Sequence, residues 1–85
     1  MFKFSNHALE QIETRSLSVQ VIEEILLSEE KLIIKVGNID IYQKIIVEVD
    51  KPYLYRVFVN NSKEPFLVVT AYKTSKIEKY ETSKD

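Results

Sequence analysis

Apolar residues change their spacing along the chain near Ser28. Before this position they recur every three or four residues, which is the spacing of amphipathic helices. From Leu32 onward they alternate with polar residues or form short apolar runs, which is typical of β-strands. The pattern therefore predicts a helical first part and a β-rich second part, which is the arrangement of an α+β domain.

Two helices are predicted in the first part. The first covers Asn6–Thr14, with Ser5 or Asn6 as its N-cap and with Ala8 and Ile12 on one apolar stripe. The second follows a break in the pattern, and Ser18 is its predicted N-cap. Its apolar face contains Val21, Ile22, Ile25 and Leu26, and its polar face contains Gln20, Glu23 and Glu24. We expect an antiparallel helical hairpin with an acidic outer face.

Four strands are predicted after the helices, at Leu32–Val36 and at residues 39–49, 53–59 and 66–72. The first two form a hairpin around Gly37 and Asn38, where we expect both turn residues to have positive φ. Residues 50–52 and 60–65 form the next two turns. Because all these connections are short, each strand is expected to pair with the next in antiparallel fashion.

The last of these strands determines how the sheet is completed. Residues 66–72 contain no charge, glycine or proline, so they indicate a strand that is buried on both faces and paired on both edges. We therefore predict that a short strand at Phe2–Phe4 covers its second edge. The result is a two-layer fold with both helices on one face of a four- to five-stranded antiparallel sheet. The open face is predicted to contain Tyr42, Lys44, Arg56, Phe58, Thr70 and Tyr72, with residues 73–80 closing one end.

Length and composition limit the possible functions. The 85 residues suffice for one domain, which we place at residues 1–80, and residues 81–85 are predicted to be a disordered tail. With no cysteine and one histidine, the chain offers no thiolate catalysis, no disulfide and no ordinary zinc site. Its adjacent acidic pairs point apart, so neither a metal nor a cofactor is predicted. The sequence shows no secretory signal and no membrane span, so we expect a cytoplasmic protein.

The net charge of −1 conceals an uneven distribution. Residues 1–42 contain four basic and seven acidic residues, which gives −3, and residues 43–85 contain eight basic and six acidic residues, which gives +2. The basic half is the strand-rich half. Because the chain is not strongly basic overall, binding to a polyanion such as RNA would require a local patch of positive charge.

The side chains available for chemistry are His7 and Arg15 on the first helix and the Arg, Lys and Tyr residues of the open face. His7 is the one side chain that titrates near neutrality without help from its surroundings. Such a set suits phosphodiester cleavage without a metal ion. A cation would hold the scissile phosphate, a His or Tyr would move protons, and the 2′-hydroxyl of RNA would attack in line.

Each of these residues also has a structural interpretation. His7 suits the exposed first turn of a helix, and Arg15 would stabilise a helix C-terminus through the macrodipole. Cross-strand packing is the simpler explanation for the aromatic residues of the open face, Tyr42, Phe58 and Tyr72. A solvated tail is the simpler explanation for the basic residues near the C-terminus, Lys73, Lys76 and Lys79.

Several short motifs resemble those of a bacterial family of small domains of unknown function. They are His7-Ala8, then Arg15, Leu17 and Ser18 at the end of the first helix, then residues 67–72 and Lys79-Tyr80. That family is similar to the RelE, ParE and BrnT toxins of type II toxin–antitoxin systems. The resemblance covers residues 4–80 and implies a RelE-like fold, which has the same order of elements as the one predicted above.

The resemblance also implies functional residues. His7 and Arg15 match the helix motif, and Thr70, Tyr72 and Tyr80 match the C-terminal one. Combined with the open face, this gives His7, Arg15, Arg56 and Tyr80 as candidate catalytic residues, and Lys44, Tyr72, Lys73 and Lys79 as candidate nucleic-acid-binding residues. We expect a toxin-like protein, acting as a metal-independent mRNA endoribonuclease, with RNA and an antitoxin protein as partners. Because some members of the similar families cleave mRNA and others poison gyrase, a non-catalytic protein-interaction module remains the alternative.

The predicted surface favours assembly. An open face with Tyr42, Phe58, Val68 and Tyr72 would expose more apolar area than a small monomer usually tolerates. Lys35 is the one charge on the edge strand Leu32–Val36, so this edge has little to discourage pairing. We therefore expect a homodimer, or a complex with a partner protein, that buries the open face or this edge.

Overall fold

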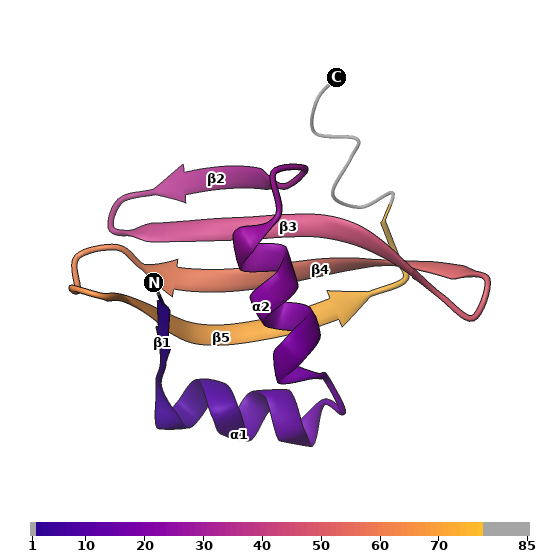
Figure 1. The fold of residues 1–85 in the computed structure, drawn as a ribbon, viewed down its shortest axis with the longest axis horizontal. Coiled ribbons are helices and arrows are strands. Elements are labelled where there is room, and N and C mark those ends of the chain that lie inside the picture. The colour runs from indigo at the N-terminus through magenta and orange to yellow at the C-terminus, as the bar shows by residue number, and fades with distance from the viewer. Residues whose placement is uncertain (1, 78–85) are drawn as a thin grey trace.

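A computed structural model describes residues 2–77 of the protein as an α+β fold, with two helices packed against a five-stranded sheet (Figure 1). The helices are α1 (Asn6–Thr14) and α2 (Val19–Leu27). The strands are β1 (Phe2–Phe4), β2 (Leu32–Val36), β3 (Ile39–Glu48), β4 (Lys51–Asn60) and β5 (Phe66–Thr74). Every predicted helix and strand is present. The predicted tail at residues 81–85 lies outside the described residues.

The strands lie in the order β1-β5-β4-β3-β2, which confirms both the meander and the position of β1 beside β5. The three hairpin-linked pairs are antiparallel, whereas β1 pairs with β5 in parallel, from Phe2 opposite Phe66 to Phe4 opposite Val68. The sheet is therefore mixed and not wholly antiparallel as predicted. Since the whole domain separates β1 from β5 in sequence, no hairpin dictates their relative direction.

Both helices cover the same face of the sheet, but they do not lie side by side. Figure 1 shows α1 running beside β5, whereas α2 crosses over the strands. The two helices therefore cross each other, and the prediction of an antiparallel helical hairpin is wrong. Neither of these helices, each nine residues long, has the length and apolar character needed to cross a bilayer.

The turn that ends α1 redirects the chain. Ser16 has a φ of 57° and lies in the left-handed region. The Ser16 amide donates to the Glu13 carbonyl at 3.0 Å, and the Leu17 amide donates to the Ile12 carbonyl at 2.8 Å. This pair of bonds is the Schellman motif. The residue at the position of Ser16 in this motif is usually glycine, because a residue with a Cβ atom is strained in the left-handed region.

We expect Ser16→Gly to raise the free energy of unfolding by about 1 kcal/mol, because glycine removes the left-handed strain of a residue with a Cβ atom. Urea denaturation followed by circular dichroism measures the change. Ser16→Ala keeps the Cβ atom and is the matched control, for which no gain is expected. Equal stability of the glycine and alanine variants would show that the Ser16 backbone is not strained.

The second hairpin turn is tighter than predicted. Val49 and Asp50 form it, with φ of 49° and 65°, and Glu48 pairs with Lys51 across it. Pro52 therefore belongs to β4 and not to the turn. A proline is tolerated there because β5 pairs with β4 only as far as Leu54, so the missing N–H of Pro52 has no strand partner to lose. In the first turn Gly37, with a φ of 63°, supplies the positive φ, and Asn38 is not among the positive-φ residues.

The core lies between the helices and the sheet. Its buried residues come from both helices and the three long strands: Ala8, Ile12, Ile22, Ile25, Leu26, Tyr42, Tyr55, Val57, Val59, Val68 and Ala71. β5 is paired on both edges as predicted, but it is not buried on both faces: Val68 and Ala71 are fully buried, and its other residues are half-buried. Tyr42 and Val68 were predicted on the open face, and both predictions are wrong because both residues belong to this core.

The register between β3 and β4 explains the error for β3. Tyr42 lies opposite Val57, and Gln43 lies opposite Arg56. Directly opposed residues project on the same face of a sheet, so Tyr42 follows Val57 toward the helices while Gln43 accompanies Arg56 on the open face. Lys44, two residues after Tyr42, lies on the helix-covered face as well. The predicted faces of β3 were therefore interchanged relative to β4.

Candidate functional site: the Arg56 group on the open face

Arg56 lies in the middle of the open face and is held by its two strand neighbours. Its Nε donates to Oε1 of Gln43 on β3 at 3.0 Å, and its Nη1 donates to the hydroxyl of Tyr72 on β5 at 2.9 Å. The register places both partners directly opposite Arg56. We call Gln43, Arg56, Phe58 and Tyr72 the Arg56 group.

The aromatic residues of the Arg56 group flank the guanidinium. Its central carbon lies 5.6 Å from the ring centroid of Phe58 and 6.0 Å from that of Tyr72. The two rings are 6.0 Å apart at an interplanar angle of 31°. All four side chains are partly exposed. A fixed, planar cation beside a phenol and two ring faces can bind a phosphate and stack a base, which are the two contacts that single-stranded RNA offers.

Arg15, at the C-terminal end of α1, is bonded to the outer edge of β5. Arg15 donates from Nη1 to the carbonyl of Ala71 at 2.7 Å and lies 3.5 Å from Oγ1 of Thr70. β1 covers β5 only as far as Val68, so Arg15 satisfies a backbone carbonyl on the uncovered continuation of that edge. This role in joining α1 to β5 is one that neither sequence interpretation of Arg15 included.

His7 is exposed in the first turn of α1. Eight helical positions separate it from Arg15, which is about 12 Å along the helix axis. Within the described residues the His7 side chain has no hydrogen bond. His7 therefore does not join Arg15 or the Arg56 group in one site.

The two candidate lysines of the described strands point to the helix-covered side. Lys44 donates to Oγ of Ser28 at 3.2 Å and to Oε1 of Glu30 at 3.4 Å, so it ties β3 to the segment after α2. The prediction that Lys44 lies beside Arg56 is wrong. Lys73, predicted in the tail, belongs to β5 and faces away from its neighbour Tyr72. Lys79 and Tyr80 lie outside the described residues.

Comparison with protein-family models, with curated proteins and with solved structures gave no significant match. The similarity to toxin families that the motifs indicate therefore stays a prediction. The function therefore has to be inferred from the side chains of the protein itself. On the open face, the Arg56 group combines positive charge with aromatic surface.

A second polar cluster, which the sequence did not reveal, lies on the helix-covered face. Glu48 accepts hydrogen bonds from the Tyr55 hydroxyl and from Lys73 Nζ, the latter at 2.7 Å. The same ammonium lies 4.5 Å from the ring centroid of Tyr53. Hydrogen bonds from Lys73 and Tyr55 lower the pKa of Glu48, while burial and the bond to Glu48 raise the pKa of Tyr55. These residues come from three strands, so only the register brings them together.

We expect this cluster to make stability depend on pH. Because the pKa of Glu48 is lowered from its ordinary value of 4.5, its contribution is present above that value and is lost as the pH falls through the lowered pKa. Glu48→Gln should be less stable than the wild type at pH 7, and the difference should shrink as the pH falls below 4.5. Urea denaturation across this range measures it.

Lys73→Met is the matched test of the same cluster, because it removes the main donor to Glu48. Its deficit relative to the wild type should shrink with falling pH in the same way, and adding Glu48→Gln to it should have little further effect. A deficit that stays constant from pH 7 to about pH 3 would contradict the role of Glu48.

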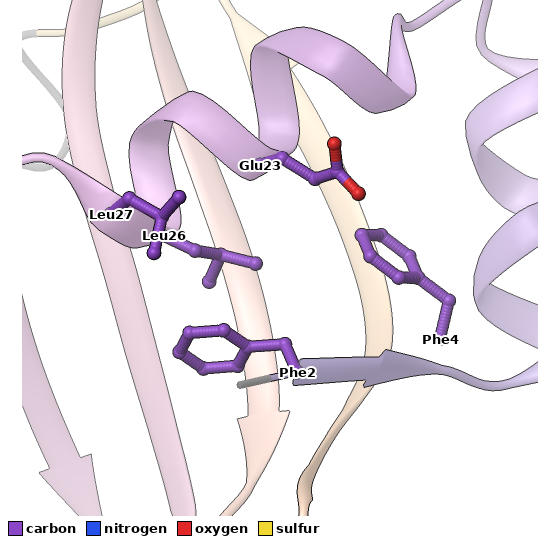
Figure 2. A pocket seen from close by; sticks show the side chains of 5 residues that line it. All are labelled: Phe2, Phe4, Glu23, Leu26 and Leu27. Carbon is purple, nitrogen blue, oxygen red and sulfur yellow. The ribbon is translucent and has the colours of Figure 1, made fainter.

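A pocket of about 490 Å³ opens between β1 and α2. Figure 2 shows Phe2 and Phe4 on one side and Leu26 and Leu27 on the other, with the Glu23 carboxylate directed toward the Phe4 ring. Its walls are apolar apart from this one carboxylate. Orientation and specificity in a ligand site usually need several convergent polar groups, so the lining by itself assigns no ligand.

Proposed function

We propose that the protein is a toxin-like RNA-binding domain that cleaves RNA without a metal ion, with the Arg56 group as its site. The observation that supports this is the position of Arg56, which Gln43 and Tyr72 hold in place on an open sheet face. A restrained guanidinium binds phosphate with less loss of side-chain freedom than a mobile one. The basic, strand-rich half of the chain contains this site, and the proposal places the protein in the cytoplasm.

The proposed chemistry uses the two polar ends of the site. Arg56 would hold the non-bridging oxygens of the scissile phosphate and stabilise the charge that develops on them. The 2′-oxygen forms a bond to phosphorus as the bond to the 5′-oxygen breaks, giving a cyclic phosphate and a 5′-hydroxyl. A proton leaves the 2′-hydroxyl and another reaches the 5′-oxygen, and Tyr72 is the group placed to take part in these transfers. Phe58 would stack a neighbouring base.

Two measurements test the proposal. Controlled expression should arrest bacterial growth, and purified protein should cleave a single-stranded RNA in EDTA but leave the same strand intact when every ribose is 2′-deoxy. The deoxy strand is the matched substrate control because it lacks the attacking hydroxyl. Absence of both growth arrest and RNA cleavage, at low as well as at physiological salt, would overturn the proposal.

A non-catalytic protein-interaction module is the second candidate, and a separate observation favours it. The open face beside the Arg56 group exposes four apolar side chains, Leu32, Val36, Ile45 and Val47, with exposed fractions between 43% and 67%. Ile45 and Val47 are neighbours on this face of β3, and exposed apolar residues that adjoin one another are typical of protein contacts. An antitoxin would be such a partner. Native mass spectrometry after affinity purification would then show a stoichiometric protein and no RNA.

A further inference from the structure

The outer edge of β2 has no strand partner within residues 2–77. β2 contains no proline, and its pairing with β3 runs without a register shift. Prolines, bulges and several charges are the usual devices that keep an edge strand from pairing. β2 has one charge, on Lys35, and this ammonium is held at 3.2 Å by the buried carboxylate of Asp40. The edge is therefore available to another extended strand.

The register of the β2–β3 hairpin determines which backbone groups face outward. Val36 pairs with Ile39 across a two-residue turn, and such a pair is hydrogen-bonded. Because hydrogen-bonded pairs alternate along an antiparallel ladder, Leu32 and Ile34 direct their N–H and C=O groups toward β3. Ile33 and Lys35 direct theirs away from the sheet. Their four backbone groups are the donors and acceptors that an added strand would meet.

We propose that a second copy of this chain supplies that strand, through antiparallel pairing of β2 with β2 about a two-fold axis at Ile34. This register matches Ile33 of each copy with Lys35 of the other, so that the four outward groups of each strand bond reciprocally. Centring the axis on Lys35 would place Lys35 opposite itself, and centring it on Ile33 would place Lys35 opposite Lys31. Like charges directly opposed are destabilising, so charge selects the axis at Ile34.

The same register covers exposed apolar surface. Leu32 of one copy lies opposite Val36 of the other on the open face, and these side chains are 57% and 60% exposed in the single chain. The two sheets become one continuous sheet with both open faces on the same side. Strand spacings of about 4.8 Å from β4 of one copy, through β3 and β2 of each copy, to β4 of the other add up to roughly 24 Å. Each Arg56 group therefore stays uncovered by the contact.

Cysteine cross-linking tests the register directly, because the natural chain contains no cysteine. Ile34→Cys should form an intermolecular disulfide under mild oxidation, since opposed residues of a non-hydrogen-bonded pair have Cα atoms about 4.5 Å apart. Leu32→Cys alone should not, since its two copies would be about 13 Å apart. A mixture of Leu32→Cys and Val36→Cys should form a heterodimer. Self-linking of Leu32→Cys as fast as that of Ile34→Cys would overturn the register.

Sedimentation of the cysteine-free chain tests the assembly itself. The wild type should sediment as a dimer, and Ile33→Pro should be monomeric because it removes an outward N–H that β3 does not use. Ile33→Ala keeps that N–H and should stay dimeric. Ile34→Lys and Ile34→Glu should each be monomeric and should associate when mixed, since unlike charges then face each other at the axis. A monomeric wild type at millimolar concentration, or failure of the charged variants to associate, would overturn the proposal.

Discussion

Replacing Ile22 by alanine is expected to lower the free energy of unfolding by about 3 to 4 kcal/mol. Ile22 is fully buried and belongs to the face of α2 that packs against the sheet. The alanine removes three carbon atoms from a site that the sheet on one side and the helix backbone on the other prevent from collapsing. An 85-residue domain has a total stability on the order of 4 to 13 kcal/mol, so the variant should lose much of it.

Gln20→Ala is the matched control for Ile22→Ala. Gln20 lies on the same helix but is exposed, so its replacement should change the free energy of unfolding by no more than about 0.5 kcal/mol. Urea denaturation of both variants at one pH gives the comparison. A loss below about 1 kcal/mol for Ile22→Ala would show that α2 is packed more loosely than its burial indicates.

If the Arg56 group is the catalytic site, Arg56→Ala should reduce the rate of RNA cleavage by about 100- to 1000-fold, which is the usual effect of removing one group that stabilises developing charge. Cleavage of a fluorescent RNA under single-turnover conditions measures the rate separately from binding. Arg56→Lys should recover only part of it, because a lysine carries the charge but cannot bond to Gln43, Tyr72 and phosphate in the same plane. Growth arrest should weaken in the same order.

Lys63→Ala controls for the loss of one positive charge, because Lys63 is exposed in the loop between β4 and β5. It should cleave at a rate within a factor of about two of the wild type once salt is physiological. Tyr72→Phe keeps the ring and removes the hydroxyl, so it separates stacking from the two roles of that hydroxyl, which are the bond to Arg56 and the proposed proton transfer. If His7→Ala reduced the rate as strongly as Arg56→Ala, the site would lie on α1 and not on the open face.

The caps of the two helices show where local sequence was sufficient. Ser18 was predicted as an N-cap, and Ser5 was one of two candidates for the other. Their side chains accept from the amides of Val21 and Ala8. Each cap joins groups three residues apart, so no distant part of the chain is needed to form it. The uncharged run in β5 was informative in part: it predicted the pairing of both edges, with β1 and with β4, but not that one face of the strand stays open.

The faces of β3 show where local sequence was not sufficient. Both alternating sets of this strand contain apolar residues, and the more uniformly apolar set, which includes Ile45 and Val47, lies on the open face. The opposite set contains Tyr42 in the core and Lys44 beside it. Periodicity shows that two faces exist but cannot say which one the helices cover, since shifting the register by one residue exchanges them.

The sequence by itself determined the order and type of the elements, the position of β1 beside β5, and the presence of Arg56 and Tyr72 among the candidate residues. Only the tertiary structure decided that Gln43 and Tyr72 hold Arg56, that Arg15 bonds to the edge of β5, and that Glu48, Tyr55 and Lys73 form one cluster. The physical reason is the range of the interactions. Caps, turns and periodicity act between residues a few positions apart, whereas each of these contacts depends on the register between strands, which the packing of the whole sheet sets.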